Sequence, residues 1–284
     1  AWPIWARLFP RLSASSGKLV DASEAITTWK DTFLIERGIS VKVISLLLCA
    51  VVLASSYPKS TRINLKEVET QIDSIVTATD GKFGIAFKDL QTGKTIYRNA
   101  TESFHAASTM KTPVMIEVFN QARHKKFSLD DSIQIVNNFS SLIDGSPYSL
   151  DISSDSDDSL YALLGKEESI RTLVYAMITV SSNLATNLLL QKIAARNVQR
   201  TMRAMGLKDI QILRGVEDSK AFDAGKNNTT TAKDLSIVYE KLARKKLVSR
   251  KACDEMLDVL LHQKFNEMIP GMLPKKVKVA HKTG

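Results

Sequence analysis

The hydrophobic pattern of this chain changes from helix to hairpin at its start and returns to a strand at its end. Apolar residues recur at helical spacing over residues 64–78, and the alternation of residues 83–98 around turn residues at 91–94 predicts a β-hairpin. Residues 275–283 alternate as a strand does. Because a strand needs a neighbour, we expect one antiparallel sheet with flanking helices, built from both ends of the chain.

The middle of the chain has the pattern of a helical domain. Five segments carry an apolar face at helical spacing, and Thr231 with Asp234 is placed as a capping box for the fourth of them. These segments are residues 109–123, 167–180, 183–196, 231–246 and a last one that begins at Ser249. The predicted fold class is therefore α+β/α: an α/β domain of residues 62–105 and 264–284, with an all-helical domain of residues 106–263 inserted in it.

Composition excludes several classes of protein. The 284 residues are 44% apolar and 24% charged, which is typical of a globular chain and excludes collagen-like and disordered classes. The net charge of +9 is spread among mixed charges without a nucleic-acid motif, so we expect a solvated basic surface and no nucleic-acid partner. Two cysteines cannot make a disulfide scaffold.

The sequence also gives no sign of a metal or a cofactor. The four histidines stand without ligand spacing; they are His105, His124, His262 and His281. Neither a Gly-rich phosphate loop nor a dinucleotide fingerprint occurs. We therefore expect no metal and no cofactor.

The N-terminal region looks foreign to the fold. The first methionine is Met110, whereas an open reading frame should offer an earlier start. From Val41 a basic residue, an apolar run and small residues follow one another, which is the pattern of a secretory signal peptide over residues 41–56. The run is shorter than the roughly 20 apolar residues that span a bilayer, and a buried helix is the alternative. We expect residues 1–40 to be a non-native upstream segment, Val41 to be a non-ATG start, and the mature protein to be a secreted or periplasmic monomer without a membrane span.

A serine and a lysine that could do chemistry stand where a loop enters a helix. Ser108 and Lys111 are three residues apart, so they share one helical face and the amine can lie within reach of the hydroxyl. The helix N-terminus adds donors that favour an oxyanion near Ser108. Alone, this spacing is common by chance and more typical of a capping serine beside a surface lysine.

Two further short motifs stand at suitable places. Ser181-Ser182-Asn183 lies between two predicted helices, 73 residues after Ser108, and Lys282-Thr283-Gly284 ends the last predicted strand, 101 residues after Ser181. Each alone fits an ordinary cap or turn. Their order and spacing together are specific.

With these three elements the sequence resembles the penicilloyl-serine hydrolase superfamily, and within it the class A serine β-lactamases, whose motifs are S-x-x-K, S-D-N and K-T-G. The resemblance covers about residues 62–284 and includes Asn187, four residues after the second motif. It implies the fold shared by serine β-lactamases and DD-peptidases. It also implies that the substrate is a small β-lactam.

The resemblance also implies catalytic roles. Ser108 would attack the lactam carbonyl, with Lys111 or a water bound to Glu217 taking its proton. Ser181 would pass a proton to the departing nitrogen. Glu217, which lies 36 residues after Ser181, would then activate the water that hydrolyses the acyl-Ser108 ester.

For substrate binding the resemblance implies Asn183 and the third motif. Asn183 would bind the side-chain amide of the substrate, and Lys282 and Thr283 its carboxylate, with Gly284 completing the motif. The family continues past this motif with more strands and a closing helix, so we expect residues 1–284 alone to be inactive or unstable.

Three departures from the family pattern bear on these roles. Ser182 stands where the family usually has Asp, and Ala221 stands where it usually has an Asn that holds the hydrolytic water. The segment 138–166 is longer than usual and carries five aspartates, which could rim the site or lie in solvent. Two alternatives therefore stay open: a DD-peptidase acting on cell-wall peptides, and a β-lactam-binding protein with slow turnover.

Overall fold

The computed structural model describes residues 64–284. The expected upstream segment, residues 1–40, and the expected signal peptide, residues 41–56, lie outside the described residues. Within residues 64–284, no helix is both long and apolar enough to cross a membrane.

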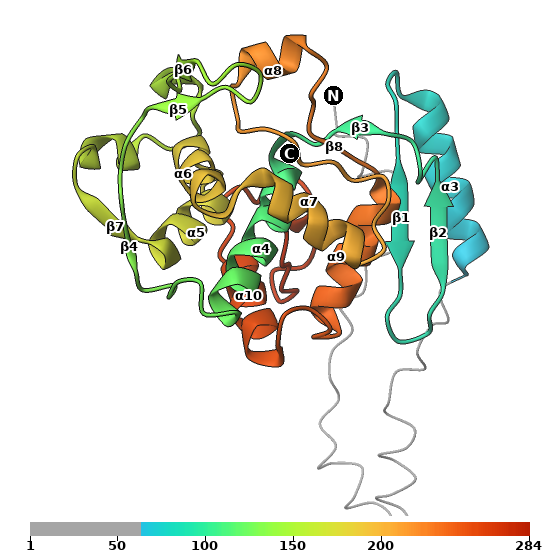
Figure 1. Ribbon diagram of the computed structural model, residues 1–284. Coiled ribbons are helices and arrows are strands. Elements are labelled where there is room, and N and C mark those ends of the chain that lie inside the picture. Colours follow the sequence, from blue (N-terminus) through green and yellow to red (C-terminus); the bar gives the residue numbers. More distant parts are fainter. Residues whose placement is uncertain (1–63) are drawn as a thin grey trace, which may run out of the picture. The chain divides into compact units, whose positions relative to one another are not determined.

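The structure begins with the predicted helix and hairpin. Helix α3 (Leu65–Ala78) is followed by strands β1 (Ile85–Lys88) and β2 (Thr95–Arg98), which pair antiparallel with Lys88 opposite Thr95. Figure 1 shows α3 on one side of the hairpin and helix α9 (Ala232–Ala243) on the other. An ion pair of 2.6 Å between Lys88 Nζ and Glu240 Oε2 joins β1 to α9.

The strand predicted for residues 275–283 does not form. Within the described chain, β1 and β2 make a sheet of two strands, and residues 273–284 pair with neither of them. The backbone N–H of His281 instead donates to the carbonyl of Leu260 at 3.4 Å. Alternation of apolar residues indicates which faces a segment can present, but it carries no information about the neighbour that a ladder requires.

The predicted helices of the middle region are present, with corrected bounds. They are α4 (Lys111–Arg123), α5 (Ile170–Thr179), α6 (Asn183–Ile193), α7 (Ala195–Ala204), α9 and α10 (Arg250–Leu261). Helix α4 packs against α5, α6, α7 and α10 at the centre of the hydrophobic core (Figure 1). The predicted helix 183–196 is two helices, because Ala194 at φ +63° interrupts it.

The expected capping box at α9 forms only in half. The Thr231 hydroxyl accepts the backbone N–H of Asp234 at 3.1 Å, as an N-cap does. The Asp234 carboxylate does not return to Thr231; it accepts the N–H groups of Asp209 and Ile210 at 2.9 and 2.8 Å. Asp234 therefore holds the loop that follows α7 against the start of α9.

Two long connections, residues 124–169 and 205–231, lie between the helices of the middle region. The first contains β4 (Ser132–Gln134) paired with β7 (Glu167–Ser169), β5 (Phe139–Ser140) paired with β6 (Pro147–Tyr148), and the short 3₁₀ turns η3 (Ile152–Ser154) and η4 (Ser159–Leu163). The second contains α8 (Ser219–Asp223). Figure 1 shows α8 above the body of the helices, next to β5 and β6.

Strand β3 (Phe104–His105) pairs with β8 (Thr229–Thr230), His105 opposite Thr229. This pairing ties the segment just before Ser108 to the end of the loop that carries Glu217. A last 3₁₀ turn, η5 (Pro270–Met272), precedes the C-terminal residues.

Candidate active site

Ser108 lies in a tight turn that leads into the central helix. A 3₁₀ turn, η2 (Ala107–Met110), runs directly into α4, and Ala107 just before Ser108 has a φ of +43°. A non-glycine residue in this region is strained, and such strain is typical of functional turns. The turn leaves the Ser108 side chain half-buried and facing a cavity.

Lys111 is buried in the first turn of α4, with 1% of its surface exposed. Its Nζ donates to the carbonyl of Ser181 at 2.6 Å, to the Ser181 hydroxyl at 3.2 Å and to Asn183 Oδ1 at 2.8 Å. These are its partners within residues 64–284, and the Ser108 hydroxyl is not among them. Lys111 is thus held by the second motif rather than by the first.

Burial is also what makes Lys111 a possible base. Desolvation lowers the pKa of Lys111 to about 7, and the Lys282 ammonium adds to this effect. The carboxylates of Asp155 and Glu217 oppose the shift and raise the pKa. A large fraction of this amine is therefore neutral near pH 7 and can accept a proton.

Ser181 joins the second motif to the third. It is 4% exposed and has a φ of +59°, a strained conformation that turns its hydroxyl toward both lysines. Its Oγ receives hydrogen bonds from Lys111 Nζ at 3.2 Å and from Lys282 Nζ at 3.0 Å. Burial lowers the pKa of Lys282 to about 8.

Asn183 connects Lys111 with Glu217. Its Oδ1 accepts the Lys111 ammonium at 2.8 Å, and its Nδ2 donates to Glu217 Oε1 at 3.2 Å. The other Glu217 oxygen accepts the backbone N–H of Asp151 at 3.1 Å. Glu217 has a φ of +61°, a third strained position in this group.

The third motif lies against the turn that holds Ser108. Lys282 Nζ also donates to the carbonyl of Thr283 at 3.0 Å and approaches its hydroxyl at 3.4 Å. A Cβ on Gly284 would lie 3.1 Å from the Thr109 side chain and 3.7 Å from the carbonyl of Ala106. The small residue allows the motif to approach the backbone beside Ser108 closely.

A cavity of about 540 Å³ lies beside these residues. Ser108, Lys111, Asn183 and Glu217 line it, together with Arg214 and other residues of the α8 loop. Among the described residues, Ser181 and the third motif do not line the cavity. Ser181 Oγ instead contacts the buried amines of Lys111 and Lys282. The structure thus brings together all eight candidate residues around one connected group.

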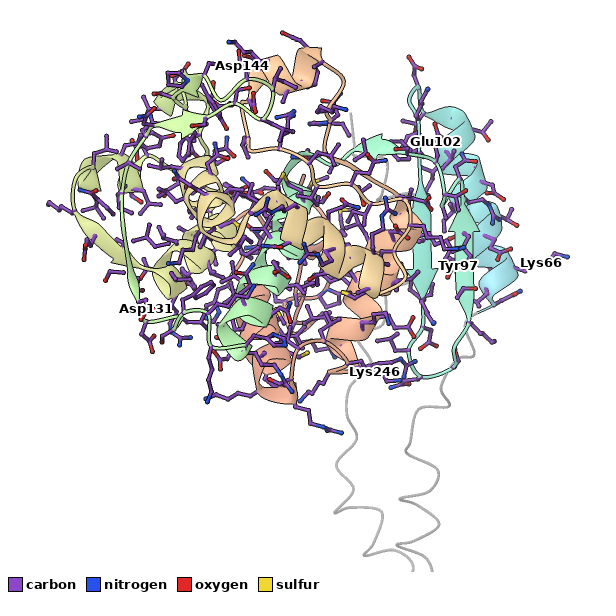
Figure 2. All side chains as sticks on the ribbon, viewed as in Figure 1. Lys66, Tyr97, Glu102, Asp131, Asp144 and Lys246 are labelled. Carbon is purple, nitrogen blue, oxygen red and sulfur yellow. The ribbon has the colours of Figure 1, made fainter. Side chains whose placement is uncertain are left out.

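The long aspartate-rich excursion contributes to this site. Figure 2 shows Asp144 beside α8, where Lys220 Nζ lies 2.7 Å from its carboxylate. Asp155 accepts hydrogen bonds from the backbone at Asn183. The excursion therefore contacts two residues of the site, Glu217 through the Asp151 backbone and Asn183 through Asp155, although none of residues 138–166 lines the cavity.

Arg214 and Phe222 are among the cavity residues that the sequence motifs did not indicate. Arg214 is 8% exposed, and its guanidinium lies 5.4 Å from the ring of Phe222 in α8. Neither stands in a recognisable motif, so only the folded loop could identify them. Within residues 64–284, no group of three His, Cys, Asp or Glu side chains is placed to hold a metal ion.

The three motifs and Glu217 thus meet in one connected group of side chains. The family model of the beta-lactamase enzyme family matches residues 67–284, and the chain belongs to that family. The resemblance to class A serine β-lactamases is therefore confirmed.

Individual relatives are distant in sequence. Beta-lactamase CARB-3 of Pseudomonas aeruginosa is 22% identical over 243 residues, which cover 84% of this chain and 78% of that protein. A beta-lactamase structure from Chitinophaga pinensis has a TM-score of 0.65 at 21% identity, covering 77% of this chain and 78% of that one. The structure of PBP-A has a TM-score of 0.64 at 23% identity, covering 78% and 77%. These neighbours confirm the predicted fold class.

Proposed function

We propose that this protein opens the β-lactam ring by forming an acyl ester on Ser108 and then hydrolyses that ester. The observation that carries the proposal is the shared cavity: Ser108, Lys111 and Glu217 all line it. A nucleophile, a base near its working pKa and a second carboxylate are the groups that a two-step acyl transfer requires.

In the first step, the Ser108 oxygen bonds to the lactam carbonyl carbon as its proton leaves. Lys111, with a pKa of about 7, takes this proton directly or through a water. The C–N bond of the ring then breaks, and the Ser181 hydroxyl gives its proton to the nitrogen. Ser181 regains a proton from the lysines that donate to it, at 3.2 Å from Lys111 and 3.0 Å from Lys282.

In the second step, water attacks the acyl-Ser108 ester and Glu217 takes its proton. The Glu217 carboxylate is held by Asn183 Nδ2 at 3.2 Å and by the N–H of Asp151 at 3.1 Å, so its position is fixed before substrate arrives. The ester bond breaks, the Ser108 oxygen takes the proton from Glu217, and the ring-opened product leaves.

Substrate binding would use the polar ends of the second and third motifs. We assign the side-chain amide of the substrate to Asn183, and its carboxylate to Lys282 and Thr283 beside Gly284. The position of Lys282 supports its role in binding the carboxylate. Its ammonium lies 3.0 Å from Ser181 Oγ, which Lys111 also contacts. An acyl-enzyme complex with penicillin G has been described for a point mutant of PBP-A, a protein of similar fold.

One observation favours a second candidate, a β-lactam-binding protein with slow turnover. Four residues after Glu217 stands Ala221, which is fully buried and has no polar group to hold a water. Acylation would then proceed, while deacylation would be slow. A DD-peptidase acting on cell-wall peptides is the remaining alternative and would not depend on Glu217.

Nitrocefin hydrolysis and mass spectrometry of the full-length protein separate these functions. For the lactamase, we expect turnover by the parent and a trapped adduct on Ser108 in Glu217→Gln, while the exposed Glu167→Gln behaves as the parent. A parent that remains acylated supports the slow-turnover protein. Turnover of a D-Ala-D-Ala peptide that is equal in parent and Glu217→Gln supports the peptidase and contradicts the role of Glu217.

The secreted or periplasmic location and the monomeric state also belong to this proposal. The signal-peptide pattern over residues 41–56 supports the location. Mass spectrometry of the mature protein would contradict it by detecting peptides from residues 1–40, and light scattering would test the monomer.

A further inference from the structure

The second motif begins a helix whose first N–H groups need acceptors. Helix α6 starts at Asn183, and the side chain of its N-cap Ser182 accepts the N–H of Ala185 at 3.2 Å. The N–H groups of Asn183 and Leu184 have no partner within the helix, as at every helix start. An unsatisfied N–H at this buried position would leave the beginning of the helix loosely held.

A carboxylate from the long excursion fills this position. The N–H of Asn183 donates to Asp155 Oδ1 at 2.8 Å and to Oδ2 at 2.9 Å. The N–H of Leu184 donates to Oδ2 at 2.9 Å. The hydroxyl of Tyr161 donates to the same oxygen at 3.1 Å, which fixes the orientation of the carboxylate.

From these contacts we propose that Asp155 is a positioning residue of the site, which supplies from 28 residues away the carboxylate that the second motif lacks at Ser182. A negative charge at a helix N-terminus is favoured by the helix dipole, so the contact is stronger than a neutral cap. The aspartate-rich excursion is thus a working part of the site.

Asp155 acts through Asn183. Because the Asn183 side chain joins Lys111 at 2.8 Å to Glu217 at 3.2 Å, fixing the backbone of Asn183 fixes the separation of the two bases. The ordered Asn183 amide would also be ready to receive the substrate's side-chain amide. This last step depends on the function proposed above.

The charge of Asp155 reaches the base as well. Three charged groups face the Lys111 amine: Lys282 lowers the pKa of Lys111, whereas Asp155 and Glu217 raise it. Removal of the Asp155 charge should therefore lower the pKa of Lys111 below its value of about 7 in the parent.

The test uses Asp155→Asn, the charge-retaining Asp155→Glu, and Asp158→Asn as a matched control, since Asp158 is exposed in the same loop. The first measurement needs no catalytic activity. In Asp155→Asn we expect the amide protons of Asn183 and Leu184 to shift upfield and exchange faster by NMR, and the Lys111 titration, followed at its ε-carbon, to move to lower pH. Neither change is expected in Asp158→Asn.

The second measurement compares acylation by penicillin G with acylation by 6-aminopenicillanic acid, which lacks the side-chain amide. In Asp155→Asn we expect acylation by penicillin G to fall about tenfold, with a smaller loss for 6-aminopenicillanic acid. Asp155→Glu should recover part of the loss. Equal losses for both compounds, or parent-like amides and Lys111 titration, would overturn the proposal. Changed amides in a protein that no β-lactam acylates would instead contradict the proposed function and leave the positioning contact intact.

Discussion

The ammonium groups of Lys111 and Lys282 converge on one hydroxyl, that of Ser181, at 3.2 and 3.0 Å. Burial of both groups and, at Lys111, repulsion by Lys282 make each easier to deprotonate than an exposed lysine. When either amine is neutral, Ser181 can donate to it rather than accept from it. Ser181 therefore links the first and third motifs through hydrogen bonds to both lysines.

This pair predicts a bell-shaped pH profile for acylation. Lys111 has to be neutral to accept the Ser108 proton, and its pKa of about 7 makes the rate rise as the pH rises through that value. Lys282 has to be charged to bind a carboxylate, and its pKa of about 8 makes the rate fall above that pH. We expect kcat/KM for penicillin G to be highest between the two values. A profile that stays flat up to about pH 10 would contradict these roles.

Lys282→Met should shift the acidic limb of that profile. The Lys282 cation lowers the pKa of Lys111, so its removal raises that pKa and moves the ascending limb of kcat/KM to higher pH. KM should rise as well, because the substrate carboxylate loses its partner. Lys278→Met is the matched control, since Lys278 is exposed four residues earlier and should keep the parent profile. An unchanged ascending limb in Lys282→Met would show that the two lysines do not interact.

Gly215→Ala should slow deacylation more than acylation. A Cβ at Gly215 would lie 2.6 Å from the Tyr148 hydroxyl and 2.9 Å from Asn187 Oδ1. Asn187 clamps the loop by bonds of 2.7 and 2.9 Å to the N–H and carbonyl of Val216, next to Glu217. Displacement of this clamp by about 1 Å can cost up to about 10²-fold in rate. We expect acyl-enzyme to accumulate in mass spectra while the labelling rate of Ser108 stays near that of the parent. Loss of labelling without accumulation would contradict this.

Asp234→Ala should destabilise the protein more than Thr231→Ala. Removal of the Thr231 cap costs about 1 kcal/mol of helix stability. Asp234 is 4% exposed and accepts two backbone N–H groups, those of Asp209 and Ile210. Because Ile210 is fully buried, the loss of its acceptor costs about 1–3 kcal/mol, whereas water can reach the exposed Asp209. Urea unfolding of the two variants measures the difference. Equal losses would indicate an ordinary capping box.

Much of the local structure follows from local patterns. Apolar spacing predicts the hairpin of β1 and β2 and the buried helix α4. Capping chemistry predicts that α10 begins at Ser249. The strand predicted at residues 275–283 is wrong, because pairing depends on which segments meet in space. The sequence indicates that segment 138–166 is unusually long. It does not indicate that Asp155 contacts the start of α6, which lies 28 residues further along the chain.

The sequence by itself determined the chemical groups of this site and the elements that carry them: Ser108 and Lys111 at the start of one helix, and Asn183 at the start of another. Those arrangements depend on neighbours within a few residues. Only the tertiary structure decided that Lys111 is held by Ser181, and that Asp155 satisfies the start of α6. The reason is that burial and long-range hydrogen bonding set the pKa and the position of each group, and both arise only when distant segments pack together.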